Sequence, residues 1–506
     1  MSDGNERNQA QGCMPEEEIF RQRKEKLFRL RQEEGYDPFA IDKFDRRHSV
    51  AWVRGKYESL SQDEEGDEEL SLAGRVMTLR RHGKASFATM EEDTGRIQLY
   101  FQLDNMGEDA YGFFKKWVDT GDILGVKGTP FRTQRGELSI KVREFKLLSK
   151  ALRPLPEKWH GLKDQEVRYR QRYLDLMVNP EVRETFRRRT RIIQTVRRVL
   201  DSHGTLEVTT PILSTLAGGA NARPFVTFHN ALGIPMYLRI ATELYLKRLV
   251  VGMFDRVYEI GPNFRNEGID LKHNPEFTAM EVYWAYANNE DMMNLCEEIL
   301  VACADEMGSR VFTYQGREIS FEPPFRRATM MDLVKEHTGI DFSTISDEEA
   351  RRIALERHVV DELKGYETRY HLLPEFFDAY VEDKLIQPTF VIGHPTVISP
   401  LAKRNAENPD ITDRFELFVN GSELANAFSE LNDPLDQRER FLEQVKQKEA
   451  GDEEAHVFDE DFVNALEYGL PPTGGMGIGI DRLVMLLTDS KSIRDVILFP
   501  TMKPKA

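Results

Sequence analysis

The chain has 506 residues, of which 40% are hydrophobic and 31% are charged, with both signs mixed. This composition supports one large globular domain with at least one smaller one, and no apolar run approaches the ~18 residues that a membrane span needs. The formal net charge of −17 argues against a general polyanion binder, although a local basic patch can still bind a nucleic acid.

The first residues, MSDGNERNQAQGC, lack the apolar segment of a secretory signal. Cys13, Cys296 and Cys303 form no CxxC pair. The spacing of Cys296 and Cys303 predicts one packed helix face rather than a metal site. These features predict a reducing, cytoplasmic location.

Residues 15–34 predict an amphipathic helix with a sparse apolar stripe and many Lys and Arg side chains. Two interpretations stay open, a solvated helix or an auxiliary arm that contacts RNA. The acidic run SQDEEGDEEL at 61–70 is typical of a linker. We therefore expect residues 1–64 to form a helical extension followed by an acidic linker.

Residues 65–150 predict an all-β domain. Five short alternating segments, separated by glycines and polar turns, favour a small closed barrel of the oligonucleotide-binding (OB) type. Arg80, Phe87 and Gln98 on these segments combine a cation, an aromatic ring and an amide, which together can stack on an unpaired base and hydrogen-bond to it. Phe87 could equally belong to the barrel core.

Residues 151–506 predict a larger domain. Segments 163–177 and 184–204 have helical spacing, and a strand and Pro211 follow, an arrangement that could form a subunit interface. Residues 325–385 predict a mostly helical insertion. Long antiparallel segments with helices between them favour an α+β fold, with a large sheet flanked by helices, over a doubly wound parallel sheet.

Side chains along residues 277–285 alternate between the two faces of a predicted strand. One face would offer Phe277, Glu281 and Tyr283 to a cavity, and the other would be core, with Thr278, Met280, Val282, Trp284 and Tyr286. In the preceding segment, Arg265 and Glu267 are two residues apart and would share one face of a strand. The alternative to a functional site is an ordinary Arg265–Glu267 salt bridge beside a satisfied buried acid.

Asn420-Gly421 predicts a tight β-hairpin. Glu416 and Glu423 would then be diagonal neighbours on one face, within ~7–8 Å, and could share a hard cation. Strict alternation would put Glu423 opposite to Asn426, Phe428 and Glu430, so we expect a β-bulge near residues 424–425 that brings both sets to one cavity. Solvated strand acids remain the alternative for Glu416 and Glu423.

The segment TGGMGIGIDRLVMLL (473–487) has alternating glycines that leave one strand face bare, on which a flat ring can lie, and Arg482 then opens a helix. Its spacing matches neither a Walker loop nor the dinucleotide-binding GxGxxG. Taken with the two hairpin acids and the loop that holds Lys272 and His273, it predicts a nucleotide site.

These segments together resemble the signature motifs of the class II aminoacyl-tRNA synthetases. FRNEG…HNPEF is similar to the second motif, GMGIGIDR to the third, and the region ending at Pro211 to the looser first motif, usually a dimer interface. The wider match resembles the bacterial lysyl-tRNA synthetases and covers about residues 65–504, including KWHGLKDQEVRYRQRYLDL, GGANARPF, TELYLKRLV and LANAFSELNDP.

The resemblance implies an ATP-dependent lysine–tRNA ligase. It would activate L-lysine with ATP to lysyl-adenylate and pyrophosphate, then transfer lysine to the 3′ end of tRNA(Lys). The implied partners are L-lysine, ATP, tRNA(Lys) and a second copy in a homodimer, without a membrane. The implied cofactor is Mg²⁺, with several ions accompanying ATP.

The resemblance also implies residue roles. Arg265 and Arg482 would be catalytic. The lysine ligands would be Gly219, Glu243, Arg265, Glu281, Tyr283, Asn426, Phe428 and Glu430. The ATP ligands would be Arg265, Glu267, His273, Asn274, Phe277, Glu423 and Arg482, with adenine between Phe277 and Arg482. Glu416 and Glu423 would ligate magnesium, and the anticodon would meet Arg80, Phe87, Gln98 and Glu137.

Three departures from the family pattern remove no implied ligand. Thr242 stands where proline is common, Thr209 where an acid is common, and Gly474 where alanine is common. Rival functions are a relative that lysylates a protein, which would lack the barrel, and a lipid lysyltransferase, which would need membrane spans. A pure nucleic-acid-binding module would have lost residues such as Arg265 and Arg482.

Overall fold

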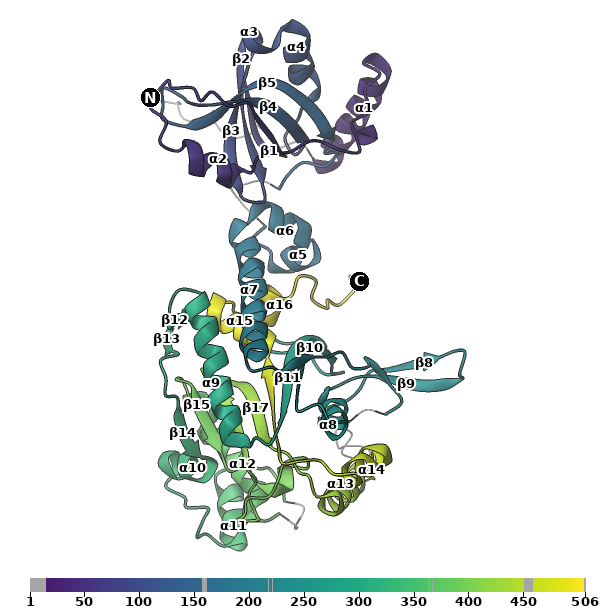
Figure 1. The fold of residues 1–506 in the computed structure, drawn as a ribbon, viewed down its shortest axis with the longest axis vertical. Coiled ribbons are helices and arrows are strands. Elements are labelled where there is room, and N and C mark those ends of the chain that lie inside the picture. Colours follow the sequence, from purple (N-terminus) through teal and green to yellow (C-terminus); the bar gives the residue numbers. More distant parts are fainter. Residues whose placement is uncertain are drawn as a thin grey trace, which may run out of the picture. The chain divides into compact units, whose positions relative to one another are not determined.

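The structure is a computed structural model that describes residues 15–156, 162–216, 218–220, 222–363, 365, 367–449 and 458–504. Cys13, Trp159, His160 and Asn221, which belong to segments discussed above, lie outside the described residues. The chain divides into two compact units, Met1–Gly161 and Leu162–Ala506 (Figure 1). Among the described helices, none has the length and apolar content needed to cross a membrane.

Unit 1 contains a closed five-stranded barrel with the strand order β1-β2-β3-β5-β4, which confirms the predicted OB-type fold. Its strands are β1 (Leu70–Arg81), β2 (Ala85–Glu92), β3 (Gly95–Gln102), β4 (Ile123–Arg132) and β5 (Leu138–Ser149). The short helices α3 (Leu103–Met106) and α4 (Glu108–Trp117), between β3 and β4, were not predicted. They bury Phe114 and Trp117 in the barrel core.

The N-terminal helix α1 (Glu16–Glu33) buries Leu27 and Leu30. Most of its basic side chains have partners inside unit 1, among them Arg21, Arg23, Lys26, Arg29 and Arg31. This pairing favours the solvated-helix interpretation over an RNA-contacting arm. Helix α2 (Val50–Tyr57) follows the short turn η1 (Pro38–Ala40).

The acidic segment 61–70 is not the free linker that its composition predicted. Glu65 accepts hydrogen bonds from Thr129 and Lys141, and Glu68 pairs with Lys56. These contacts fasten the segment to the barrel and to α2, so its charge serves local pairing.

A buried ion cluster closes the end of the barrel. The Lys150 ammonium lies 2.6 Å from Asp119 and 2.7 Å from Asp122, and the side chains of Lys150 and Asp122 are fully buried. Lys26 of α1 also pairs with Asp119. Burial raises the pKa of Asp122 although Lys150 opposes that shift.

Unit 2 is built on an eight-stranded sheet with the order β14-β15-β16-β17-β18-β11-β10-β6. Neighbouring strands are antiparallel except at the two edges, where β14 with β15 and β6 with β10 are parallel. This α+β architecture confirms the predicted fold class. The strands are β6 (Leu206–Glu207), β10 (Arg256–Phe264), β11 (Glu276–Ala285), β14 (Arg326–Thr329), β15 (Thr389–Ile392), β16 (Arg414–Phe418), β17 (Glu423–Ser429) and β18 (Thr473–Gly479).

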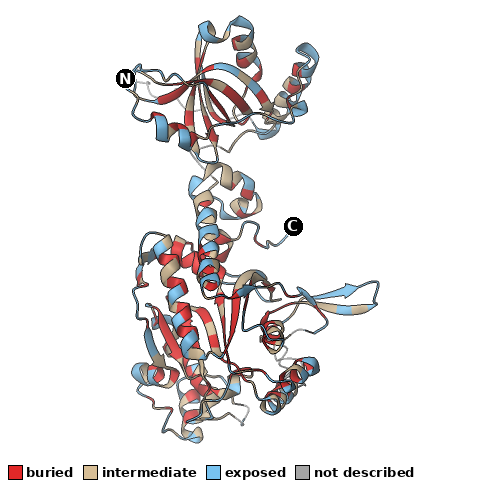
Figure 2. Cartoon of the chain, viewed as in Figure 1, coloured by how far each residue is buried: buried red, intermediate tan, exposed pale blue. Residues whose placement is uncertain are grey.

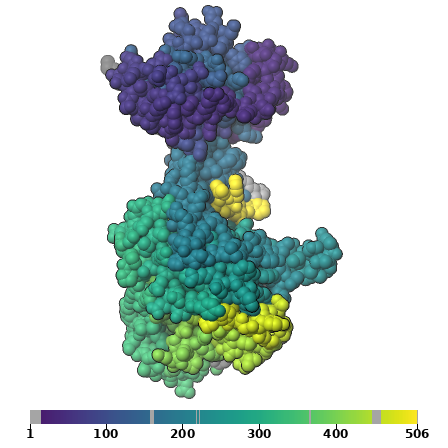
Figure 3. Space-filling model, in the orientation of Figure 1, coloured from purple at the N-terminus to yellow at the C-terminus, as the bar shows by residue number. Residues whose placement is uncertain are grey.

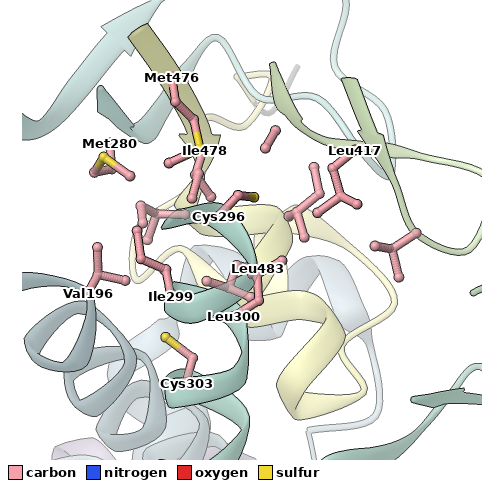
Figure 4. Packing of buried hydrophobic residues seen from close by; sticks show 14 of the residues in the cluster. Val196, Met280, Cys296, Ile299, Leu300, Cys303, Leu417, Met476, Ile478 and Leu483 are labelled. Atoms are coloured by element: carbon pink, nitrogen blue, oxygen red, sulfur yellow. The ribbon is translucent and has the colours of Figure 1, made fainter. Parts of the chain in front are cut away.

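Three helices cover one face of this sheet: α7 (Pro180–Ser202), α9 (Asn289–Glu306) and α15 (Ile480–Thr488). Figure 4 shows Val196, Ile299 and Leu483 from these helices packed with Met280 and Met476 of the sheet. Cys296 and Cys303 lie fully buried in this cluster, which confirms the predicted packed helix face. The opposite face of the sheet is therefore the one left for polar side chains.

One residue of the predicted core face is misplaced. Met280, Val282 and Trp284 are buried in the core as expected, and the half-buried Thr278 accepts a hydrogen bond from Arg189 of α7, but Tyr286 is 76% exposed. Its positive φ of 62° ends the strand alternation and turns its side chain outward, so the prediction that Tyr286 is core was wrong.

The remaining elements surround the sheet. Residues 325–385 contribute α10 (Met330–Thr338), α11 (Asp347–Glu356) and α12 (Arg369–Tyr380), and the edge strand β14 lies within the same stretch. Other helices are α5 (Gln165–Arg170), α6 (Arg172–Val178), α8 (Glu243–Val251), α13 (Pro434–Glu449), α14 (Glu460–Glu467) and α16 (Ile493–Val496), with short turns η2 (Glu382–Lys384) and η3 (Thr396–Ile398). Strands β12 (Val311–Tyr314) and β13 (Arg317–Ser320) form a separate hairpin.

A three-stranded sheet, in the order β7-β9-β8, projects from unit 2 (Figure 3). Its strands are β7 (Leu213–Ser214), β8 (Val226–His229) and β9 (Ile234–Leu238). Figure 2 shows the β8–β9 hairpin as exposed or half-buried along its length. Its exposed apolar side chains include Leu213, Val226, Phe228 and Leu232.

We predict that Lys150→Met destabilises unit 1 by about 3 kcal/mol, because it leaves the buried Asp122 carboxylate without its cation, while Asp119 keeps Lys26. Hydrogen exchange of the barrel strands in rising urea measures this loss. Lys24→Met is the matched control, since Lys24 is exposed on α1 and its replacement should cost less than about 0.5 kcal/mol. Equal stabilities of the two variants would contradict the prediction.

Candidate functional site

The polar face of the large sheet lines one cavity of about 400 Å³. All the residues predicted for lysine, ATP and metal binding line it except Glu430, namely Gly219, Glu243, Arg265, Glu267, His273, Asn274, Phe277, Glu281, Tyr283, Glu416, Glu423, Asn426, Phe428 and Arg482. The cavity combines segments more than 200 residues apart in sequence, from Gly219 to Arg482. The fold thus brings together side chains that the sequence analysis had grouped only by motif.

Strands β11 and β18 form the floor of this cavity. Glu281 lies opposite Gly477, and Tyr283 lies opposite Gly475. A Cβ atom at Gly475 would lie 2.0 Å from Glu430 Oε1 and 2.4 Å from Tyr283 Cε1. The absence of a side chain at this position therefore leaves the space that the Glu430 carboxylate and the Tyr283 ring occupy. Met476 and Ile478 point to the opposite, apolar face, as predicted.

Three carboxylates are buried at the inner end of the cavity. Glu243, Glu281 and Glu430 have exposed fractions of 7%, 9% and 1%. Lys247, which is fully buried, lies 2.6 Å from Glu243 Oε1 and also forms an ion pair with Glu430 Oε2. Glu430 Oε1 has no hydrogen-bond partner in the described part of the chain.

The charges of this group do not balance. Three carboxylates face one ammonium, so 3 − 1 leaves an excess of two acids among the fully buried groups. Burial raises the pKa of Glu243 and Glu281 and takes the pKa of Glu430 well above its ordinary value, and neighbouring acids add to the shifts of Glu281 and Glu430. A guest with two cationic groups would relieve this repulsion.

Lys247 competes with a guest for Glu430. Burial alone would lower the pKa of Lys247, but Glu243 and Glu430 raise it above its ordinary value, so the ammonium stays charged. The Glu430 carboxylate thus has a fixed cation at one oxygen, while the other, buried oxygen has no hydrogen-bond partner in the described chain. Lys247 was not predicted as a partner of Glu430.

Among the described residues, Arg265 forms no ion pair with a carboxylate, and none with Glu267 in particular. Its guanidinium lies 5.2 Å from the centre of the Phe277 ring, and its buried Nε has no hydrogen-bond partner in the described chain. Arg265 can therefore turn its charge to an anionic ligand. The alternative of an ordinary Arg265–Glu267 salt bridge is wrong.

The predicted hairpin and its bulge are both confirmed. Asn420 and Gly421 have φ angles of 52° and 63°, and the Val419 N–H donates to the Ser422 carbonyl at 3.0 Å. Strand pairing shifts register between Leu417 and Phe418, so that Phe418 lies opposite Glu423 and Leu417 opposite Ala425. Glu416 then faces Asn426, and the shift turns Glu423 toward the same cavity.

Glu416 and Glu423 suit a hard cation whose other ligands come mostly from the substrate and from water. Arg414 lies 2.6 Å and His394 lies 3.4 Å from Glu416. Although burial opposes them, His394 and Arg414 lower the pKa of Glu416 to about 2, so the carboxylate is ionised. In the described residues no group of three or more His, Cys, Asp and Glu side chains could hold a metal alone. Two carboxylates with phosphate oxygens are the usual ligands of Mg²⁺.

The loop between β10 and β11 meets the hairpin and α15. Arg482 donates to the Glu423 carbonyl, and its guanidinium lies 3.3 Å from His273 Nε2. The Lys272 ammonium donates to the Gly421 carbonyl at 3.2 Å. These contacts gather three cationic or titratable side chains on one wall of the cavity, opposite the buried acids, which suits a polyphosphate.

In unit 1, the residues predicted for the anticodon lie on one surface of the barrel. Arg80 is paired with Phe87 across β1 and β2, and Gln98 donates to Ser139 at 2.9 Å. Glu137 is exposed next to this surface. Phe87 is half-buried. The centre of its ring lies 4.9 Å from that of Tyr100, and the centres of the Tyr100 and Phe131 rings lie 5.6 Å apart. Three aromatic rings in a row form a platform on which bases can stack.

Several side chains of these surfaces were missed. Lys247 follows Glu243 by four residues on one helix, a spacing that signals contact. Tyr100 and Phe131 fit the alternating pattern of their strands, but nothing in the sequence distinguishes them from the aromatic residues that are common in any strand. Arg414 precedes Glu416 by two residues on β16, a spacing that puts both on one strand face, whereas His394 carries no signal because its contact with Glu416 depends on the pairing of β15 with β16.

Comparisons with known proteins agree with this geometry. A family model described as class II tRNA synthetases (D, K and N) matches residues 164–503. A second model, described as an OB-fold nucleic acid binding domain, matches residues 70–148. The two matches cover unit 2 and the barrel of unit 1.

Similar full-length proteins are described as lysine–tRNA ligases. The protein of Syntrophomonas wolfei is 55% identical over 491 residues, which are 97% of this chain and 98% of the relative. That of Thermoanaerobacter pseudethanolicus is 56% identical over 490 residues, 96% of each chain. That of Clostridium tetani is 53% identical over 504 residues, 98% of this chain and 99% of the relative.

We predict that Gly475→Ala lowers the free energy of unfolding of unit 2 by about 1–3 kcal/mol, because the new methyl group overlaps Glu430 and Tyr283. Gly477→Ala is the matched control on the same strand, where the added Cβ would meet its nearest atom, Glu281 Cγ, at 3.7 Å. Its cost should stay within about 0.5 kcal/mol. Urea unfolding of the two variants checks the difference, and equal losses would exclude the overlap as the cause.

Proposed function

Because the chain belongs to the class II tRNA synthetases (D, K and N), we propose that it is a lysine–tRNA ligase. It activates L-lysine with ATP and transfers lysine to tRNA(Lys). The observation that carries the choice of lysine is the buried excess of carboxylates at the inner end of the cavity. An amino acid with an anionic or neutral side chain would leave these acids unpaired.

In this proposal the two ammonium groups of lysine divide the acids between them. Glu281 and the open oxygen of Glu430, with the Tyr283 hydroxyl, receive the ε-ammonium. Glu243, beside the backbone at Gly219, receives the α-ammonium. Asn426 and Phe428 complete the wall of the pocket.

ATP occupies the other half of the cavity. Adenine lies between Phe277 and Arg482, and Glu267, His273 and Asn274 contact the nucleotide. Glu416 and Glu423 would hold Mg²⁺, which supplies charge neutralisation to the phosphates when bound. This division leaves Arg265 between the two substrates.

The reaction needs no nucleophile from the protein. The lysine carboxylate attacks the α-phosphorus of ATP and displaces pyrophosphate, which gives lysyl-adenylate. The terminal 3′-hydroxyl of tRNA then attacks the mixed anhydride and releases AMP. Arg265 and Arg482 contribute by positioning the substrates and neutralising charge on the phosphates.

Unit 1 provides the tRNA anticodon site. Phe87 stacks on a base, and Arg80, Gln98 and Glu137 supply hydrogen bonds, as the resemblance implied. Tyr100 and Phe131 continue the stacking surface. Because every base has a π-face, such a row holds the bases while the polar groups select among them.

A homodimer forms through the three-stranded β7-β9-β8 sheet in our proposal. The apolar side chains there are strongly exposed, with Val226 at 65%, Phe228 at 57% and Leu232 at 66%. A contiguous exposed apolar surface of this kind is typical of a protein interface. The region follows the segment that resembles the first motif, which ends at Pro211.

We expect ATP–pyrophosphate exchange that depends on lysine and on no other standard amino acid. Arg265→Ala should lose about 3–4 kcal/mol of transition-state stabilisation, roughly 10²–10³ in kcat/KM, because the group that faces the carboxylate and α-phosphate is gone. Arg352→Ala is the control, since Arg352 pairs with Glu349 and Glu356 on α11.

Exchange activity also separates the rival functions. A nucleic-acid-binding module would exchange with no amino acid, and that outcome would contradict our proposal. Charging of tRNA(Lys) rather than of a protein acceptor separates the ligase from a protein-lysylating relative.

For the dimer, we expect Phe228→Asp to dissociate the protein into monomers of 58.6 kDa, because a charge would be buried in an apolar interface. Light scattering after size exclusion measures the mass. Tyr468→Asp is the control, since Tyr468 is 89% exposed next to α14, away from the β7-β9-β8 sheet. A monomeric unsubstituted protein would contradict the proposed dimer.

A further inference from the structure

The backbone of Thr242 makes the shortest polar contact of Glu281 in the described chain. The Thr242 N–H donates to Glu281 Oε1 at 3.1 Å, and both residues are buried, with exposed fractions of 4% and 9%. The other two contacts of this carboxylate, from Asn263 Nδ2 and the Tyr283 hydroxyl, are each 3.5 Å long. One backbone donor therefore determines where Glu281 points.

The local backbone explains why this donor is available. Thr242 directly precedes α8, and its carbonyl accepts from the N–H groups of Tyr245 and Leu246. Its own N–H lies outside the hydrogen-bond ladder of the helix and points to the carboxylate on β11. The Thr242 hydroxyl forms no hydrogen bond of good geometry in the described residues, although it also helps to lower the pKa of Glu281, after the larger effect of the backbone N–H. Any residue except proline could provide the N–H.

The charged surroundings make a fixed donor important. Glu243 faces Glu281 from α8, where Lys247 pairs with Glu243, and Arg265 and Asn263 face it from the β10 side. Tyr283 and Glu430 complete the group. Glu259, directly across from Glu281 on β10, is held by Arg239 and Thr210.

These groups act on Glu281 in opposite directions. Burial raises the pKa of Glu281, the Thr242 N–H lowers it, and the Glu243 charge raises it again. Hydrogen bonds to a charged acceptor are stronger than those to a neutral one, so the N–H favours the ionised carboxylate.

We propose that the Thr242 N–H is a positioning donor for substrate recognition: it holds the Glu281 carboxylate aimed at the place where the ε-ammonium of lysine enters. This inference rests on the proposed lysine–tRNA ligase function. Thr242 is a positioning residue, because it acts through Glu281 and not on the substrate.

Thr242→Pro removes the donor, while Thr242→Ala and Thr242→Val keep it and remove the hydroxyl. We expect Thr242→Pro to raise KM for lysine about tenfold at pH 6.5, with kcat and KM for ATP within about twofold, since one such bond is equivalent to roughly one pKa unit. The acid limb of kcat/KM for lysine should move up by about one pH unit. The sign follows because the carboxylate now takes up its proton at a higher pH.

Thr242→Ala and Thr242→Val, which lose only the weaker hydroxyl contact, should change both readouts less than the loss of the N–H does. A second variant guards against misfolding of the proline form. It replaces Thr242 with its α-hydroxy acid counterpart by nonsense suppression, which exchanges only the N–H for an oxygen. Thermal unfolding and KM for ATP report whether each variant retains the fold.

The outcomes separate this inference from the function on which it rests. Lysine-dependent exchange in the unsubstituted protein, with an ester variant that keeps its KM and pH profile, overturns the positioning role alone. Equal effects of the alanine, valine and ester variants overturn it too, because they assign the role to the side chain. An unsubstituted protein with no lysine-dependent exchange overturns both.

Discussion

The buried acids of unit 2 impose the constraint from which the rest of the site follows. Glu243 and Glu430 share one fixed ammonium and Glu281 lies beside them; burial raises the pKa of all three acids, and neighbouring acids raise those of Glu281 and Glu430 further. Such a group costs stability unless cations complete it. The sheet tolerates this cost because its other face, with α7, α9 and α15, forms a large apolar core that holds the strands in register.

The alternation of side chains explains why so much of the site could be predicted. Period-2 patterning on β11 and β18 assigned Glu281, Tyr283 and the bare glycine face correctly, since any other register would expose Met280 and Met476. The Asn420-Gly421 turn fixed the pairing of β16 with β17 strongly enough that a bulge had to follow. In both cases local geometry and the hydrophobic pattern pointed to the same arrangement.

What could not be predicted depends on contacts between segments that have no shared period. Lys247 of α8 meets Glu430, and His394 after β15 meets Glu416 of β16, only because separate elements of the chain are assembled around one cavity. The acidic segment 61–70 has the composition of a linker, yet Glu65 finds partners on the barrel. The prediction for Tyr286 was wrong for a local reason. Its positive φ ends the alternation of faces at Ala285, whereas the sequence pattern continues through Tyr286. Composition and period describe single elements, and pairing between elements decides the rest.

The contact between Thr242 and Glu281 shows how backbone chemistry can adjust a site whose side chains are unchanged. A new side chain near a buried carboxylate changes the volume of the site as well as its polar groups. The close packing around Gly475 leaves little room for added volume. A backbone N–H adds a donor without adding an atom to the cavity. The Thr242 N–H lies at the N-terminus of α8. The partial positive charge of a helix N-terminus likewise stabilises the ionised form of an acid. Variation at a residue that never touches the substrate can therefore change how firmly the pocket holds its negative charge.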